Sequence, residues 1–215
     1  MQKIKIFLVA LTAFAAVGCL DKIPGSAIPQ DQAMQTFDDA EQTVTGIYSL
    51  FKSGALYSGL LTILPDLQAD FVYAVDGYSN TYGDIWQWKI RSTNSEVESV
   101  YAALYRVIGR CNFFLDQVEE LRDSMTDDES IQTLDYYTGE VHCARALAYS
   151  ELIKLFCKAY ESDEEAADEL GVVLKKKYYS NDPLVRASLK DSYQFVLDDL
   201  ARAEDCLQID EDNEE

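Results

Sequence analysis

The residues best suited to chemistry are few, and none of them forms a known catalytic motif. The only histidine, His142, stands beside Cys143 in a helical pattern. A Cys–His nucleophile needs its two side chains to face each other, but adjacent positions of an α-helix point about 100° apart. Glycine-rich phosphate loops, Gly-x-Ser-x-Gly elbows and His-Glu-x-x-His pairs do not occur. We therefore expect a protein that is not an enzyme and has no catalytic residue.

Metal and cofactor sites are not indicated either. A single histidine and the lack of a Cys-x-x-Cys pair argue against a zinc site. Acidic residues alternate in the tail 210–215, but this segment lacks the glycine and the distal glutamate of a calcium-binding EF-hand loop. With 38 acidic residues, carboxylate pairs are expected by chance, and no glycosidase pair can be singled out. The sequence predicts no metal and no cofactor.

Both tryptophans of the chain, Trp86 and Trp88, lie two positions apart in a loop-rich region. Exposed aromatic rings can stack on the apolar face of a sugar, while nearby amides and carboxylates bind its hydroxyl groups. In an extended segment the two rings would share a face, whereas in a helix they would not. The alternative to ligand binding is that the two tryptophans pack in the hydrophobic core. The candidate ligand-binding residues are Trp86, Trp88, Asn94, Asp84 and Asn80.

The charge balance narrows the choice of partner. The chain has 18 Lys and Arg against 38 Asp and Glu, which gives a net charge of -20. Such an acidic surface repels nucleic acid and anionic lipid headgroups but tolerates neutral polar ligands. The 14 tyrosines and 9 phenylalanines supply ample aromatic surface for stacking. We expect no binding to nucleic acid.

The N-terminus has the pattern of a bacterial lipoprotein signal. Lys3 and Lys5 form a basic start, and residues 6–17 form an apolar run too short for a confident membrane span. Small residues precede Cys19, as in a lipobox. An ordinary secretory signal with an incidental cysteine is the alternative. We predict a signal peptide over 1–18, lipidation of Cys19 and membrane anchoring through its acyl chains, followed by a lipidated tether over 19–35.

Helical periodicity organises the rest of the chain. Expected helix starts are Thr36, Thr126 and Ser95, the last two in Ser/Thr-x-x-Glu capping boxes, and Ser188 caps a last helix. The first helix should end near Gly54, the second near Arg122 and the third at Tyr160. A short connector makes the second and third helices antiparallel neighbours. Residues 69–75 could be helix or strand, 162–168 read as an acidic linker, and 170–174 could be extended. Paired amphipathic helices suggest an all-α helical repeat.

The helix expected over 126–160 has an unusually small middle, with Gly139 at its centre. Small side chains let another helix approach closely, and glycine inside a helix costs about 1 kcal/mol against alanine. Gly139 therefore calls for a packing reason. The remaining cysteines also fall on helical patterns, and we favour buried small hydrophobes over disulfides for them. They are Cys111, Cys143, Cys157 and Cys206.

Several segments together resemble the SusD/RagB family of outer-membrane nutrient-binding lipoproteins. The matching segments are Ala40-Glu41 with Gly46-Ile47-Tyr48, Tyr105 with Ile108 and Asn112, Gly139-Glu140 with Arg145-Ala146, Tyr149 and Leu155-Phe156, Gly171-Val172-Val173-Leu174, and Arg186-Ala187-Ser188 with Tyr193, Asp199-Leu200 and Ala203. Cys157 departs from the family's usual glycine, and Val173 from its proline. Family members are much longer, so the chain corresponds to their N-terminal half.

The resemblance implies antiparallel helix hairpins of tetratricopeptide-like repeat with irregular loops over 36–209, followed by the acidic tail 210–215. It implies structural roles for Gly139, Glu140, Arg145 and Tyr149, with Glu140 and Arg145 as a buried pair. It also implies a non-catalytic, lipid-anchored protein of the outer membrane, at the cell surface. Such a protein binds a glycan or another nutrient and delivers it to a TonB-dependent, SusC-like transporter. The alternative is an interaction module that docks a transporter without binding sugar.

Overall fold

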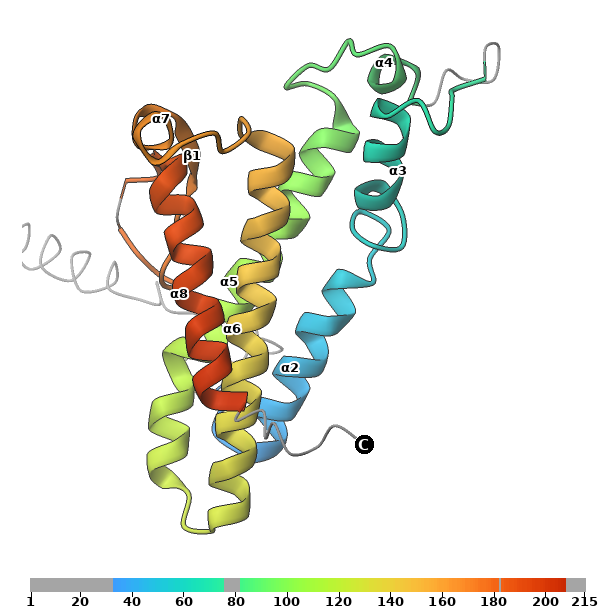
Figure 1. Cartoon of the computed structure of the whole chain (residues 1–215). Coiled ribbons are helices and arrows are strands. Elements are labelled where there is room, and N and C mark those ends of the chain that lie inside the picture. The colour runs from blue at the N-terminus through green and yellow to red at the C-terminus, as the bar shows by residue number, and fades with distance from the viewer. Residues whose placement is uncertain (1–32, 76–81, 182, 208–215) are drawn as a thin grey trace, which may run out of the picture. The chain divides into compact units, whose positions relative to one another are not determined.

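The computed structural model describes residues 33–75, 82–181 and 183–207 (Figure 1). These residues form seven helices and one two-stranded antiparallel sheet, which confirms the predicted all-α class. The elements are α2 (Phe37–Phe51), α3 (Leu60–Gln68), α4 (Gly83–Trp86), α5 (Ser95–Ser124), α6 (Asp128–Phe156), α7 (Asp163–Asp168), β1 (Leu170–Val173), β2 (Arg186–Ser188) and α8 (Leu189–Leu207).

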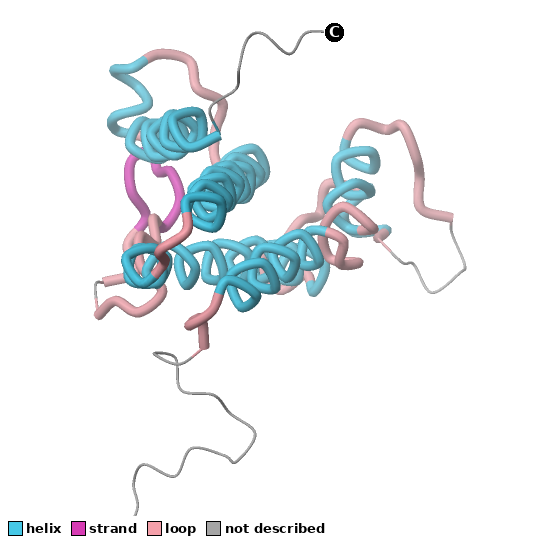
Figure 2. The backbone as a smooth tube through the Cα atoms, turned by 90° about the horizontal axis from the view of Figure 1, so that it is seen from below, coloured by secondary structure: helices cyan, strands magenta, loops and turns pink. Residues whose placement is uncertain are grey.

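The long helix that the sequence predicts around Gly139 is α6, and it is the centre of the described fold. It runs antiparallel to α5 after a short connector, α8 packs along a second side, and α2 contacts both α5 and α6 (Figures 1 and 2). Buried side chains of α6 accordingly point to several neighbours. They include Leu134, Val141, Ala148, Leu152 and Ile153. Helices α3 and α4 lie apart from the α6–α8 pair and contact each other, with α3 also touching α5.

The helix starts follow from short polar side chains. Thr36 caps α2 as predicted: its hydroxyl accepts from the Asp39 amide at 3.2 Å, and the Asp39 carboxylate accepts from the Thr36 amide at 3.0 Å. The predicted cap of α6 was wrong by one residue. Asp127, not Thr126, accepts from the Ser130 amide at 2.8 Å, because a carboxylate one position later reaches the same free amides. The N-cap of α5 is likewise Asn94 and not Ser95.

Two segments differ from the predicted outline. The prediction of an acidic linker over 162–168 is wrong, because Ser162 accepts from the Glu165 amide and caps the short helix α7. Residues 69–75 form neither helix nor strand. The extended segment after Leu170 is confirmed as β1, which pairs with β2 with Leu170 opposite Ser188. The long helix α6 ends at Phe156, short of the predicted Tyr160.

The buried face of α8 is more polar than predicted. The apolar periodicity of the last helix predicts that Leu197 and Leu200 face inward, but these side chains are 57% and 43% exposed. The buried stripe instead follows spacings of three and four residues through Leu189, Ser192, Val196, Asp199 and Ala203. Helical geometry puts Asp199 on the stripe and the two leucines beside it, so a carboxylate enters the core.

The cysteine prediction holds for one residue only. Cys111 is fully buried, and burial raises the pKa of its thiol to about 12. Cys143 is exposed, and Cys157 and Cys206 are partly exposed, which contradicts the expectation of burial for these three. All four thiols are free. Of the four positions, that of Cys111 is the one that faces the core between the helices.

Gly139 has the packing reason that the sequence called for, because the C-terminal turn of α8 lies against it. A Cβ atom there would stand 2.8 Å from Leu207 Cγ and 3.0 Å from Cys206 Cβ. We expect Gly139→Ala to lower the free energy of unfolding by about 1 kcal/mol net, since overpacking outweighs the gain in helix propensity. Urea unfolding followed by circular dichroism measures this. Gly46→Ala, where nothing lies within 4 Å, should instead be stabilising. Equal effects for both variants would contradict the close approach of α8.

Candidate functional site

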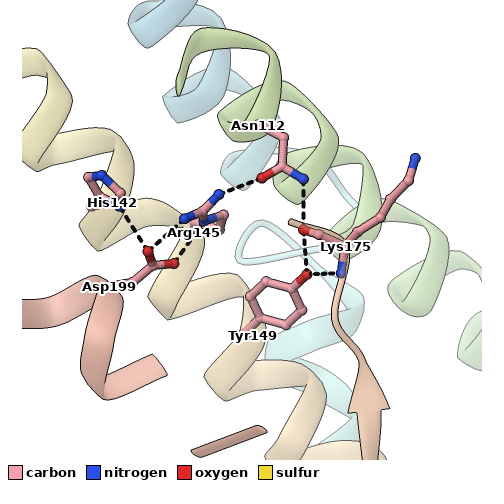
Figure 3. Close-up of polar contacts among 6 residues, drawn as sticks. All are labelled: Asn112, His142, Arg145, Tyr149, Lys175 and Asp199. Carbon is pink, nitrogen blue, oxygen red and sulfur yellow. Dashed lines mark hydrogen bonds and ion pairs between the residues drawn. The ribbon is translucent and has the colours of Figure 1, made fainter. Parts of the chain in front are cut away.

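A buried polar network joins α6 to α8 and α5. The Arg145 guanidinium of α6 donates from Nε to Asp199 Oδ2 and from Nη2 to Asp199 Oδ1, both at 2.7 Å (Figure 3). Its Nη1 donates to the Asn112 Oδ1 of α5 at 2.6 Å. The side chains of Arg145 and Asp199 are only 4% and 1% exposed. This bidentate geometry satisfies two buried charges at once, as buried ion pairs require.

His142 completes the set of donors around Asp199. Its Nδ1 lies 2.8 Å from Asp199 Oδ1. An ionised carboxylate only accepts hydrogen bonds, so Nδ1 carries the proton. Burial alone would raise the pKa of Asp199, but the hydrogen bonds from Arg145 and His142 outweigh it and hold that pKa below its usual value. His142 is therefore an anchor of the carboxylate, with no cysteine partner.

The network continues to the backbone that leaves β1. The Asn112 amide nitrogen donates to the Lys175 carbonyl at 2.8 Å. The Tyr149 hydroxyl accepts from the Lys175 amide at 2.7 Å and donates to the Lys175 carbonyl at 3.0 Å (Figure 3). Burial raises the pKa of Tyr149, so the hydroxyl stays protonated. Five buried side chains thus form a frame that fixes one point of a surface loop: Asn112, His142, Arg145, Tyr149 and Asp199.

The predicted pair of Glu140 and Arg145 is wrong. Glu140 lies on the side of α6 toward α2, where it accepts from the Tyr48 hydroxyl at 2.9 Å. Burial, followed by this bond, raises the pKa of Tyr48 to about 12. Helical geometry separates the two residues, because five positions turn about 500° and leave them on different faces. The partner of Arg145, Asp199, is 54 residues away in sequence.

The predicted ligand-binding residues that the structure describes lie in or next to α4, in a region that we call the aromatic arm: residues 69–75 and 82–94. Trp88 is 64% exposed and follows α4, while Trp86, at the end of α4, is partly buried. The Trp86 ring meets Tyr73 with 6.4 Å between centroids. The two tryptophan rings do not pack against each other. Two further rings, Phe71 and Tyr73, are 82% and 72% exposed, and the sequence analysis did not single them out.

The polar candidates are less well placed than the rings. Asn94 Oδ1 accepts from the Arg91 amide at 2.6 Å, so it closes its own turn. Asp84 lies in the first turn of α4 and is partly buried. Asn80 falls outside the described residues. The sequence grouped these three by proximity alone, and the structure gives Asn94 a local role.

Backbone strain is concentrated in the aromatic arm. The non-glycine residues with positive φ in the described chain are Asp70, Tyr82 and Trp88, at 59°, 61° and 57°. A bulky residue in the left-handed region costs free energy and persists only where its surroundings enforce it. At Trp88 this conformation accompanies an exposed indole.

An apolar pocket of about 110 Å³ lies beside the arm. Its walls come from α3, α4, the segment between α4 and α5, the start of α5 and the end of α6. Six of the lining residues are Leu64, Ile85, Ile90, Val97, Leu155 and Phe156. Gln68 is the polar side chain among its walls. A pocket with so few hydrogen-bonding groups suits an apolar group better than a sugar hydroxyl.

Within the described part of the chain, no three His, Cys, Asp or Glu side chains gather closely enough to hold a metal ion. Nor does any helix of residues 33–75, 82–181 or 183–207 have the length and apolar character to cross a membrane. The arrangement offers aromatic surface, a small apolar pocket and a rigid internal frame. These features make a helical scaffold with exposed aromatic surface.

The comparisons with known proteins give this scaffold its family. The chain matches the model of a SusD-like family, described as "starch-binding associating with outer membrane", over residues 20–213. The chain therefore belongs to the SusD-like family, whose members are non-catalytic binding proteins. This confirms the family that the sequence motifs indicated.

Individual relatives agree with this assignment. A SusD-like protein of Formosa agariphila is 25% identical over 159 residues, which are 70% of this chain and 29% of that protein. A SusD homologue from Bacteroides thetaiotaomicron superposes with a TM-score of 0.69 at 25% identity, covering 82% of this chain and 31% of its own. A second SusD superfamily protein from that organism gives 0.67 at 20%, covering 80% and 37%. The chain thus spans about a third of these relatives.

Proposed function

We propose that the chain is a helical part of a lipid-anchored outer-membrane protein that binds a glycan without cleaving it. The observation that carries the proposal is membership of a family described as starch-binding and associated with the outer membrane. The aromatic arm is the glycan-binding surface in this proposal. Its Trp88 ring supplies an exposed apolar face, and Phe71 and Tyr73 are further exposed rings of the arm.

Three properties of the arm support a binding role. Large exposed hydrophobic surfaces on a soluble fold mark interaction sites. Strained residues at Asp70, Tyr82 and Trp88 flank α3 and α4, and such outliers gather at functional sites. The residues of the buried network are also not part of the arm, so a ligand on the arm would leave the hydrogen bonds of Arg145 and Asp199 in place. A neutral glycan suits the strongly acidic chain better than an anionic one at this position.

The test is the affinity for maltohexaose, measured by isothermal titration calorimetry on the full chain in detergent. We expect Trp88→Ala to weaken binding about tenfold or more, because an exposed aromatic anchor is lost. Tyr136→Ala removes another exposed ring, 48% accessible on α6, and should leave affinity unchanged. Unchanged affinity in Trp88→Ala, with binding intact, would refute the arm as the site. No binding to maltohexaose or to a panel of neutral glycans would refute glycan binding itself.

Delivery to a transporter is the second half of the proposal. Anchoring would use Cys19, and the bound glycan would pass to a TonB-dependent, SusC-like partner at the outer membrane. Replacing Cys19 by Ala should release the protein from the membrane fraction, and pull-down of the tagged chain from its host should recover the transporter. A Cys19→Ala protein that stays in the membrane fraction would contradict the anchor.

The alternative function is an interaction module that docks such a transporter and binds no sugar. The apolar pocket beside the arm favours it, since Leu64, Ile90 and Phe156 offer almost no hydrogen bonds to a saccharide. Recovery of the transporter together with a lack of affinity for every glycan would select this function.

A further inference from the structure

A second surface of the chain combines positive charge with aromatic rings. We call residues Lys175–Tyr179 the basic loop. It follows β1 and contains the only run of three consecutive basic residues in a chain of net charge -20. Lys176 and Lys177 are exposed, and Tyr179 is 76% exposed. No ion pair joins any of the three lysines to another described residue. Their charge is available to a ligand.

Side chains of α5 and α6 hold the backbone of the basic loop in place. Tyr149 bonds to both the amide and the carbonyl of Lys175, and Asn112 bonds to the same carbonyl. At the other end, the Tyr178 amide donates to Asp116 Oδ2 at 2.8 Å. An ordinary surface loop needs no such support. A binding loop gains from it, because a pre-organised loop loses less entropy when its ligand arrives.

The aromatic rings of the loop form a continuous stack with α5. Tyr179 meets Tyr178 edge to face with centroids 5.1 Å apart, and Tyr178 meets Phe113 at 5.4 Å. The Arg110 guanidinium lies 5.9 Å from the Phe113 centroid. Phe113 packs against Tyr178 and holds its ring, whereas the outermost ring, Tyr179, faces solvent. An exposed ring beside cations has the two elements that a charged sugar needs: an apolar face and donors for an anion.

Of the lysine ammonium groups, one lies at this stack and one lies beside α8. The Lys176 ammonium lies 6.0 Å from the centroid of Phe195 on α8, and the Lys175 ammonium is 3.4 Å from the Tyr178 carbonyl. Asp116 is the nearby carboxylate, and its Oδ2 already accepts from the Tyr178 amide. The loop itself carries three lysines and no carboxylate, although the whole chain is strongly negative.

We propose that the basic loop is a second saccharide-binding site, selective for acidic sugars that carry carboxylate or sulfate groups. Tyr179 stacks on the sugar ring, and Lys176 and Lys177 bind the anion. An anionic membrane surface is a poorer occupant. A net charge of -20 opposes approach to such a surface as a whole, whereas a small ligand meets only the local field within about 8–10 Å.

The site is independent of the aromatic arm. The proposed function could fail at Trp88 while the basic loop still binds acidic sugars, and the reverse also holds. The two sites differ in the charge of their ligands. Trp88→Ala should leave acidic-sugar affinity unchanged, and changes in the basic loop should leave maltohexaose affinity unchanged.

The test is calorimetric titration of the full chain in detergent with an oligogalacturonate, and with maltohexaose as its uncharged counterpart. We expect the oligogalacturonate affinity to fall about tenfold in the Lys176→Gln/Lys177→Gln double variant and several-fold in Tyr179→Ala. Raising NaCl from about 50 to about 300 mM should weaken binding as well, because salt screens the ammonium groups. Lys52→Gln changes an exposed lysine at the end of α2 and is the matched control.

Tyr149→Phe tests the supporting frame. This substitution changes neither the lysines nor the Tyr179 ring, but it removes both hydrogen bonds between the Tyr149 hydroxyl and Lys175. We expect weaker oligogalacturonate binding together with unchanged salt dependence and an unchanged circular dichroism spectrum. A lack of oligogalacturonate binding would overturn the proposal, as would equal affinity in the double variant. Binding to phosphatidylglycerol vesicles without binding to the oligosaccharide would also overturn it, since that outcome identifies a lipid-binding loop.

Discussion

The Asp199→Asn variant should lose about 3–5 kcal/mol of its free energy of unfolding. The amide keeps the shape of the carboxylate but removes its charge, so the Arg145 guanidinium stays buried without a counter-ion. The amide nitrogen of the variant is itself a donor, and it would face other donors, because Arg145 and His142 both donate to this side chain. Urea unfolding at about pH 7, followed by circular dichroism, measures the change.

Asp198→Asn is the matched control for this prediction. Asp198 precedes Asp199 on α8 but is exposed, and its carboxylate accepts from Gln194 at 2.8 Å. We expect a change within about 0.5 kcal/mol, as for other surface substitutions. A similar loss in both variants would show that α8 tolerates no amide in this turn, and the ion pair would lose its assigned role.

Acid should remove the same stabilisation. The pKa of Asp199 is lower in the folded chain than its unfolded value of about 3.9. Its contribution is therefore complete above the unfolded pKa and disappears as the pH falls through the folded pKa. The difference in unfolding free energy between the wild type and Asp199→Asn should shrink over that range. A difference that stays constant with pH would contradict an ionised, buried Asp199.

Gly171→Ala is the second variant with a large expected effect. A Cβ atom at this position of β1 would lie 2.0 Å from Ser192 Oγ and 2.4 Å from the Ser188 carbonyl oxygen. The second contact is backbone, so a change of rotamer cannot relieve it. We expect a loss of about 3 kcal/mol, at the upper end of the cost of overpacking. Thermal and urea unfolding should both report it.

Two further variants separate a clash from a general sensitivity to alanine. Gly109→Ala in α5 adds the same methyl group where nothing lies within 4 Å, and it should not destabilise. Ser192→Ala combined with Gly171→Ala should recover little, because the Ser188 carbonyl remains and the Ser192 hydroxyl no longer accepts from the Val172 amide. Full recovery by Ser192→Ala would place the constraint in the hydroxyl alone.

These two contacts explain how the scaffold supports its surface. Gly171 lets β1 cross close to the start of α8, and the Asp199 network fixes α8 against α6. Together they set where the chain leaves β1, at Lys175. The basic loop is thus positioned by the interior. The aromatic arm depends on other contacts, chiefly between α3, α4 and the start of α5.

Local chemistry in the sequence was enough to predict most of the elements. The reciprocal bonds of Thr36 and Asp39 involve residues three positions apart, and periodic apolar residues identify α5 and α6 without knowledge of any partner. The errors were of two kinds. Asp127 displaced Thr126 as a cap because neighbouring short polar residues compete for the same amides. The segment over 162–168 became α7 because its cap outweighed the mutual repulsion of its acidic residues.

The candidate sites were predicted only in part. Trp86 and Trp88 drew attention as residue types, but their conformations could not be foreseen. The φ of 57° at Trp88 depends on the turn that follows α4, and the exposure of Phe71 and Tyr73 depends on a segment that adopts no regular structure. Loop conformation is set by surrounding contacts more than by propensity, so the sequence indicated a ligand surface without its geometry.

By itself, the sequence determined that this is an all-α chain with SusD-like motifs, centred on one long helix. It also determined that this helix has the small residue Gly139 in its middle. Periodicity, caps and composition act over a few residues, which is why they can be read along the chain. Tertiary structure alone decided the partner of Arg145. Glu140 was near in sequence, but helical geometry turned it away toward Tyr48 and brought in Asp199 from α8. A buried charge takes the counter-ion that reaches it in space, and that choice is made when helices pack.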